Sequence, residues 1–210
     1  MPDTTELEQF SEEFFQDILS ESENGGWRED IFFDKFTDYL TDAGEFNEAI
    51  RASYQPASGQ LRVDGYCGDP LESGSTGGSD EPLTLGLIVL DFHQSGDLAT
   101  LGTRDMNAIF NRLMRYLNSA LNPQWRRSLE TSDPGFGLAD LIATRWSRIT
   151  KIRLFLLTNK VLSNRVDGKT AGDYQGRSVV YSVWDIKRLF ALTKAANGQE
   201  PLQVRFDEKP

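Results

Sequence analysis

Residues 83–93 (LTLGLIVLDFH) are the feature that most limits what this chain can fold into. The run is apolar on both faces as far as Leu90, and polar residues come only at its end. Such a strand lies in the middle of a sheet that is covered on both sides, because a solvent-facing strand would alternate apolar and polar residues. Residues 152–158 (IRLFLLT) and 178–183 (SVVYSV) predict two further buried strands. The chain is therefore expected to form an α/β domain around a central sheet.

Amphipathic helices are predicted before and between these strands, because apolar residues recur there at helical spacing. The order of elements favours one mixed sheet flanked by helices. The predicted helices are residues 6–20, 28–41, 98–121, 138–149 and 184–192, and alternating residues predict shorter strands at 60–66 and 202–206.

One domain accounts for the whole chain, since 210 residues are enough to bury a single core. Acidic helices are expected in residues 1–50 and a sheet-and-helix core in residues 51–206. Residues 68–82, rich in Gly, Ser and acids, are predicted to form a flexible loop within that core.

The composition indicates a protein of a reducing compartment, and a cytoplasmic location is expected. One cysteine cannot form an internal disulfide. The first residues, MPDTTELEQF, lack the basic and apolar regions of a signal peptide. No apolar run reaches about 18 residues, so no membrane span is expected.

Charge is distributed unevenly along the chain, whose net charge is −10. Residues 1–103 carry 22 acidic and 4 basic side chains, whereas residues 104–210 carry 10 acidic and 18 basic ones. The total argues against a free-standing nucleic-acid binder, because phosphates repel such a surface on average. A basic face on the second half could still bind phosphate, while pairing with the acidic half is the alternative. The arginines concerned are Arg104, Arg112, Arg115, Arg126, Arg127, Arg145, Arg148 and Arg153.

Asp64, Asp91 and His93 are the strongest candidates for a catalytic site. Asp91 and His93 stand two residues apart where the central strand turns polar, so they are expected to share one face. If the preceding strand pairs beside it, Asp64 approaches Asp91. Two converging carboxylates are typical ligands of Mg²⁺ or Mn²⁺, so Asp64 and Asp91 are the predicted metal ligands. The alternatives without a catalytic role are an Asp-Gly turn at Asp64 and a solvated strand end at Asp91 and His93.

Two weaker candidates lie near this trio. Glu45 and Glu48 could add a carboxylate, although a solvated acidic face explains them more simply. Cys67 could form a nucleophile pair with His93, although an ordinary buried thiol is the simpler interpretation.

The order of elements and the two aspartates resemble those of restriction-endonuclease-like nucleases of the PD-(D/E)xK type. These proteins follow helix–strand–strand–strand–helix–strand order, with Asp on the second strand and Asp/Glu-x-Lys on the third. Asp64 matches the first position and Asp91 the second, but His93 stands where the lysine is expected. A histidine with a pKa of about 6.5 is mostly neutral at pH 7, so it would act as a base or weak ligand, or the site would be inactive.

A second resemblance covers most of the chain. Residues 149–192, with RLFLLTNKVLS and VVYSVWDIKRL, closely resemble the amino-terminal domain of the AIPR family of abortive phage infection proteins. The segments LRVDGY, LIVLDF and PLQVRF fit the same domain. The resemblance implies a domain of a longer prokaryotic phage-defence protein, with nucleic acid as a plausible target.

Two functions remain open from the sequence. The first is a nuclease-like domain that hydrolyses phosphodiesters with Mg²⁺ or Mn²⁺. The second is a non-catalytic module of the same defence protein, serving protein interaction, homo-oligomerisation or nucleic-acid sensing. The remaining carboxy-terminal region of the longer protein is an expected partner in either case.

Overall fold

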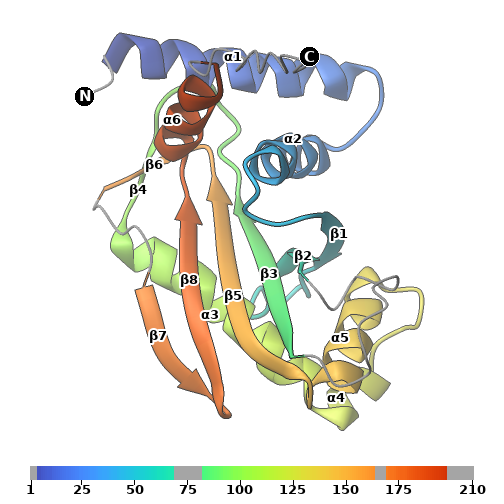
Figure 1. The fold of residues 1–210 in the computed structure, drawn as a ribbon. Helices are drawn as coiled ribbons and strands as arrows, with labels where there is room; N and C mark the ends of the chain where they lie inside the picture. The colour runs from blue at the N-terminus through green and yellow to red at the C-terminus, as the bar shows by residue number, and fades with distance from the viewer. Residues whose placement is uncertain (1–3, 69–81, 164–168, 198–210) are drawn as a thin grey trace, which may run out of the picture.

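A six-stranded mixed sheet organises the chain (Figure 1). The computed structural model describes residues 4–68, 82–163 and 169–197. The sheet has the order β1-β2-β3-β5-β8-β7, and a separate two-stranded pair joins β4 to β6. The strands are β1 (Ala49–Tyr54), β2 (Val63–Cys67), β3 (Leu83–Asp91), β4 (Thr100–Leu101), β5 (Ile149–Thr158), β6 (Val161–Leu162), β7 (Lys169–Tyr174) and β8 (Arg177–Trp184). The helices are α1 (Thr4–Glu23), α2 (Arg28–Asp42), α3 (Thr103–Ala120), α4 (Pro123–Arg127), α5 (Pro134–Arg145) and α6 (Ile186–Asn197).

The centre of the sheet is parallel and both of its margins are antiparallel. β3 pairs in parallel with β5, and β5 with β8. β1 and β2 precede them as an antiparallel pair, β2 runs antiparallel to β3, and β7 runs antiparallel to β8. The mixed sheet predicted from the buried runs is thus confirmed. Because β3, β5 and β8 are parallel, their carboxyl ends lie at the same end of the sheet.

Helices cover both faces of the sheet. Leu85, Leu87 and Val89 of β3 belong to a core shared with α3 and α5. Ile88 and Leu90 belong to a second core, shared with α1, α2 and α6. Alternate residues of β3 therefore enter opposite cores, which explains why its sequence is apolar on both faces. In Figure 1, α1 crosses the end of the sheet that carries the carboxyl ends of the parallel strands.

The boundaries differ from the sequence prediction where local patterns are weak. β1 was not predicted, because its sequence, AIRASY, lies at the sheet edge and lacks a clear alternation. α5 begins at Pro134, earlier than expected, because the Asp133 carboxylate accepts the Gly135 N–H at 2.8 Å and caps the helix. The predicted strand at 202–206 and most of the predicted loop at 68–82 lie outside the described residues. None of the described helices is long and apolar enough to cross a membrane.

Candidate functional site

Polar side chains gather where β3 and β5 end side by side. The parallel register places Asp91, the last residue of β3, opposite Thr158, the last residue of β5. Ligand sites of α/β sheets lie at the carboxyl ends of such strands. Asp64 belongs to the same neighbourhood, because β2 lies next to β3 on its other side.

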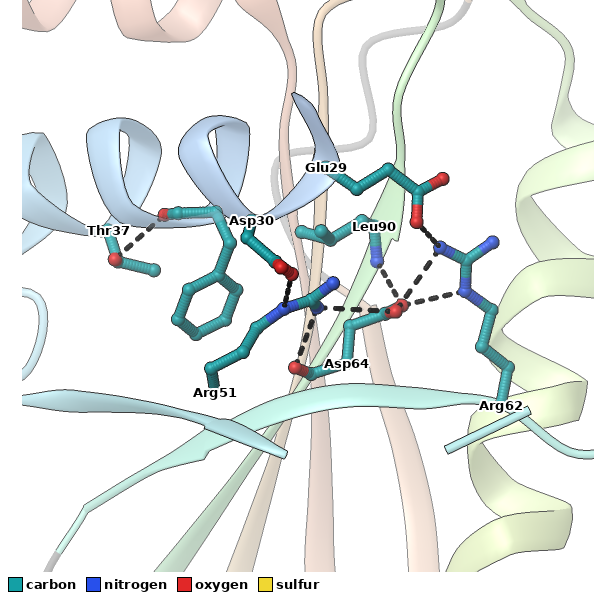
Figure 2. Close-up of polar contacts among 8 residues, drawn as sticks. Glu29, Asp30, Thr37, Arg51, Arg62, Asp64 and Leu90 are labelled. Atoms are coloured by element: carbon teal, nitrogen blue, oxygen red, sulfur yellow. Dashed lines mark hydrogen bonds and ion pairs between the residues drawn. The ribbon is translucent and has the colours of Figure 1, made fainter. Parts of the chain in front are cut away.

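Asp64 is a buried carboxylate that two arginines enclose (Figure 2). Its Oδ2 accepts hydrogen bonds from Arg62 Nε at 2.7 Å and from the Leu90 N–H at 2.9 Å. Arg51 Nη1 approaches Oδ1 at 3.4 Å and donates to the Asp64 carbonyl at 2.8 Å. Arg51 and Arg62 in turn meet the α2 carboxylates Asp30, at 2.7 Å, and Glu29, at 3.6 Å. The negative charge of Asp64 is thus fully compensated by protein groups.

The Asp64–Gly65 pair lies within β2 and forms no turn. Pairing of β2 with β3 runs from Cys67 to Gly65, and the Asp64 side chain then accepts the next β3 amide, that of Leu90. Gly65 is required because a Cβ there would lie 2.5 Å from the ring of Phe33 on α2. The interpretation of this dipeptide as a turn is therefore wrong. Both residues belong to a strand, and the glycine is there because α2 packs directly on that strand.

Asp91 forms an ion pair that the sequence did not predict. Its Oδ1 lies 3.0 Å from Lys160 Nζ, and its Oδ2 accepts the Thr158 hydroxyl at 3.2 Å. Lys160 comes from the turn between β5 and β6, and its N–H donates to Thr158 Oγ1 at 3.1 Å. An ammonium group thus stands beside this carboxylate although position 93 holds a histidine.

Arg62 connects the two aspartates electrostatically. Burial lowers the pKa of its guanidinium, but the charges of Asp64, Glu29 and Asp91 raise it, and the net change is upward. Both aspartates therefore act on the same cation from neighbouring strands. In the described part of the chain, no group of three or more His, Cys, Asp or Glu converges as a metal site would require, so a predicted ion there depends on the two aspartates and water.

His93 lies beyond the end of β3, where strand alternation no longer applies. Its backbone is held by the buried Asn159, whose Oδ1 accepts the His93 N–H and whose Nδ2 donates to the His93 carbonyl, both at 2.7 Å. The imidazole is not part of the pocket that Asp91 lines. The catalytic role of His93 stays a prediction. The expectation that it shares a face with Asp91 loses its basis, because His93 is not part of the strand.

The turn that carries Lys160 is fixed by the start of α6. Asp185 Oδ2 accepts the Leu162 N–H at 2.9 Å, while its Oδ1 caps α6 by accepting the Arg188 N–H at 2.8 Å. The Ile186 N–H donates to the Lys160 carbonyl at 3.2 Å. Asp185 belongs to the VWDI segment that carried the family resemblance, and its structural effect is to hold the lysine-bearing turn against α6.

A pocket of about 270 Å³ opens beside Asp91. Its polar lining combines two carboxylates, of Asp91 and Asp105, with the cations of Arg62, Arg112 and Lys160. Within the described ranges, the Arg112 guanidinium has no ion-pair or hydrogen-bond partner. Since Arg62 and Lys160 already pair with Asp64 and Asp91, Arg112 is the cation that this pocket offers to an anionic group, and a planar guanidinium suits phosphate in particular.

Other charged candidates are used elsewhere in the fold. Arg153 lies in the middle of β5, where its guanidinium meets Glu45 at 3.1 Å and stacks over the ring of Phe155. Glu45 is therefore a partner of the basic half and does not join Asp64 and Asp91. Arg126 donates to the Ala120 carbonyl at 2.5 Å, near the end of α3.

The prediction that Cys67 and His93 could form a nucleophile pair is wrong. Cys67 faces Gly86, and His93 lies seven residues further along from Gly86, which corresponds to roughly 20 Å at the usual rise of a strand. The thiol is 2% exposed, and burial raises its pKa to about 12 although Arg153 lowers it. Cys67 is a structural core residue.

We expect Cys67 to resist alkylation at pH 8 in the folded protein and to react fully in denaturant. A raised thiol pKa means that the folded state favours the neutral form, so this contribution to stability holds below pH 9.0 and is lost as the pH rises toward about 12. Mass spectrometry after iodoacetamide treatment measures the modified fraction. Rapid native labelling at pH 8 would contradict the burial of the thiol.

Among the residues of this site that sequence reasoning missed, Thr158, Asn159 and Lys160 are consecutive in the chain. They follow a buried apolar strand directly, as Asp91 does, so the criterion that selected Asp91 could have selected them. Their contacts with Asp91 and His93 span 66–69 residues of sequence, and only the register of β3 and β5 brings them together.

The fold and the site define an α/β domain with a charged pocket at the carboxyl ends of adjacent parallel strands. The model of one family, AIPR_N, the abortive infection phage resistance protein N-terminal domain, matches residues 32–191. The chain belongs to this family. α1 and the last residues of α6 lie outside the matched span. Searches of curated proteins and of solved structures found no match.

Proposed function

We propose that this domain is a nuclease-like unit that binds and hydrolyses phosphodiesters at the Asp91–Lys160 pocket. The observation that carries the proposal is the ion pair of 3.0 Å between Lys160 and Asp91 beside the pocket. It supplies a lysine next to the third-strand carboxylate, which is the feature that the sequence lacked at position 93.

The order of elements supports the same proposal. With the short β4 and the helices α4 and α5 left aside, α2, β1, β2, β3, α3 and β5 follow the helix–strand–strand–strand–helix–strand order of restriction-endonuclease-like nucleases. Asp64 lies on the second of these strands and Asp91 ends the third.

The donor chemistry of the two aspartates fits Mg²⁺ or Mn²⁺. Both are hard oxygen ligands on neighbouring strands, Asp91 faces the pocket, and such ions retain several waters. Asp64 and Asp91 would hold the ion, with Arg62 released from Asp64, and the ion would supply charge that polarises a phosphoryl oxygen. In the described state Arg62 and Lys160 provide the counter-charges of the two carboxylates.

The protein's own cations have distinct tasks in this proposal. Arg112, whose guanidinium lines the pocket, binds a non-reacting phosphate oxygen. Lys160 stabilises the negative charge that develops at the reacting phosphate, and Asp91 keeps its ammonium in place.

The test is cleavage of plasmid DNA and of RNA with Mg²⁺ or Mn²⁺, compared with EDTA. We expect metal-dependent cleavage that falls at least about 100-fold in Asp91→Asn. Asp97→Asn is the matched control, because Asp97 follows the same strand but bonds only to Ser95 in the described structure. Calorimetry should show Mn²⁺ binding that Asp91→Asn removes. Cleavage that is absent with either metal, or unaffected by Asp91→Asn, would contradict the proposal.

A second candidate function is a non-catalytic interaction module. The observation that favours it is the complete engagement of Asp64 by Arg51, Arg62 and the Leu90 amide. An Asp64 held permanently in this way would have a structural role, and the protein would then bind no Mn²⁺ in the calorimetric experiment.

A further inference from the structure

We infer that the cavity around Trp27 is a nucleobase subsite, and that the substrate of the adjoining pocket is a single-stranded nucleic acid. This inference rests on the proposed phosphodiester chemistry and adds the class of its substrate. It comes from an aromatic side chain that the core does not use.

Trp27 is held outward at the start of α2. Its side chain is 82% exposed, more than any other large apolar side chain among the described residues. Gly25 and Gly26, with φ of 100° and 151°, form the break from which the chain enters α2 at Arg28. Most of the surface of this residue is therefore open to a planar ligand.

The cavity beside Trp27 is nearly neutral by its charged lining residues, whereas the pocket at Asp91 offers the guanidinium of Arg112. The Trp27 cavity measures about 730 Å³, and its charged lining residues compensate one another, with Arg51 held by Asp30 at 2.7 Å. The Gln94 side chain, an amide with donors and an acceptor, completes the polar lining. An indole face with a neutral hydrogen-bonding wall fits a base better than a phosphate.

The two cavities lie on either side of the Asp64 cluster. Glu29 lines the Trp27 cavity and contacts Arg62, which lines the Asp91 pocket, at 3.6 Å (Figure 2). Gln94 follows Asp91 by only three residues. A nucleic-acid strand with one phosphate at Arg112 and Lys160 can therefore extend toward Trp27. A base inside a duplex is stacked on both faces, so a base that stacks on Trp27 must be unpaired.

The test measures binding of fluorescently labelled single-stranded DNA, single-stranded RNA of the same sequence, and the DNA duplex. The full chain carries Asp91→Asn, so that binding is recorded without cleavage. We expect single strands to bind more tightly than the duplex, and Trp27→Ala to weaken single-strand binding roughly 5- to 100-fold. Trp27→Phe should retain part of the affinity. Tyr39→Ala, at another partly exposed aromatic on α2, is the matched control and should change nothing.

Each result supports or overturns the subsite. Trp27-dependent binding of single strands supports it even if the unmutated chain cleaves nothing, in which case only the proposed hydrolysis fails. If the unmutated chain cleaves nucleic acid but Trp27→Ala leaves the affinity for single strands unaltered, only the subsite is overturned. Absence of binding by any strand, or equal binding of duplex and single strands, also overturns it. The two single strands decide between DNA and RNA. Protection from acrylamide of the tryptophan fluorescence that Trp27→Phe removes reports stacking, because the chain has four tryptophans.

Discussion

Lys160→Met is expected to lower the rate of metal-dependent phosphodiester cleavage by about 100- to 1,000-fold. The substitution keeps a side chain of similar length but removes the charge that faces Asp91 Oδ1 at 3.0 Å. The side chains of Lys160 and Asp91 are 23% and 18% exposed, so the pair is partly buried, and the free energy of unfolding should fall by about 1–2 kcal/mol, between the values of exposed and buried pairs. Initial rates on plasmid DNA and RNA measure the effect.

Lys151→Met is the matched control for this experiment. Lys151 is an exposed lysine on the same strand, β5, far from its carboxyl end, so its loss should leave the rate unchanged. Lys160→Arg keeps the charge and should restore part of the activity. Wild-type cleavage by Lys160→Met would show that the lysine is only a counter-ion of Asp91.

Asp64→Ala is expected to lower the free energy of unfolding by about 3–5 kcal/mol. The Asp64 side chain is 2% exposed and its loss leaves the half-buried guanidinium of Arg62 with only the more distant Glu29. The Leu90 amide also loses its acceptor. Urea denaturation followed by circular dichroism measures the change.

Controls separate the buried charge from a general effect of removing an aspartate. Asp38→Ala removes an exposed carboxylate from α2 and should change stability by no more than about 0.5 kcal/mol. The double variant Asp64→Ala/Arg62→Met should lose less than the sum of the two single variants, because neither charge is left alone. Additive losses would contradict a direct coupling of the two side chains.

The elements with long apolar patterns could be predicted from the sequence. β3 and β5 are apolar on both faces, and α2 and α3 bury the stripes that their spacing indicates. β1 lacked such a pattern, because its six residues, AIRASY, are mostly half-buried and include Arg51 and Ser53. The position of Asp91 at the end of β3 also followed from the sequence, because polar residues at the end of an apolar strand are visible locally, whereas the place of Asp64 depended on the pairing of β2 with β3.

The partners of those residues could not be predicted in the same way. Lys160 lies 69 residues from Asp91, and Asn159 lies 66 residues from His93. Arg62 stands two residues from Asp64, where strand alternation places both side chains on the same face but says nothing of the salt bridge or of Glu29.

The sequence by itself determined the class of fold and the membership in the abortive infection family, and it singled out the two aspartates whose role in the site stays a prediction. The tertiary structure alone decided that a lysine from the turn after β5 stands at Asp91, that Asp64 is enclosed by two arginines, and that Trp27 is open to solvent beside them. The physical reason is that periodicity reports which face of an element is buried, whereas the pairing of strands and the packing of α2 decide which distant side chains share a site.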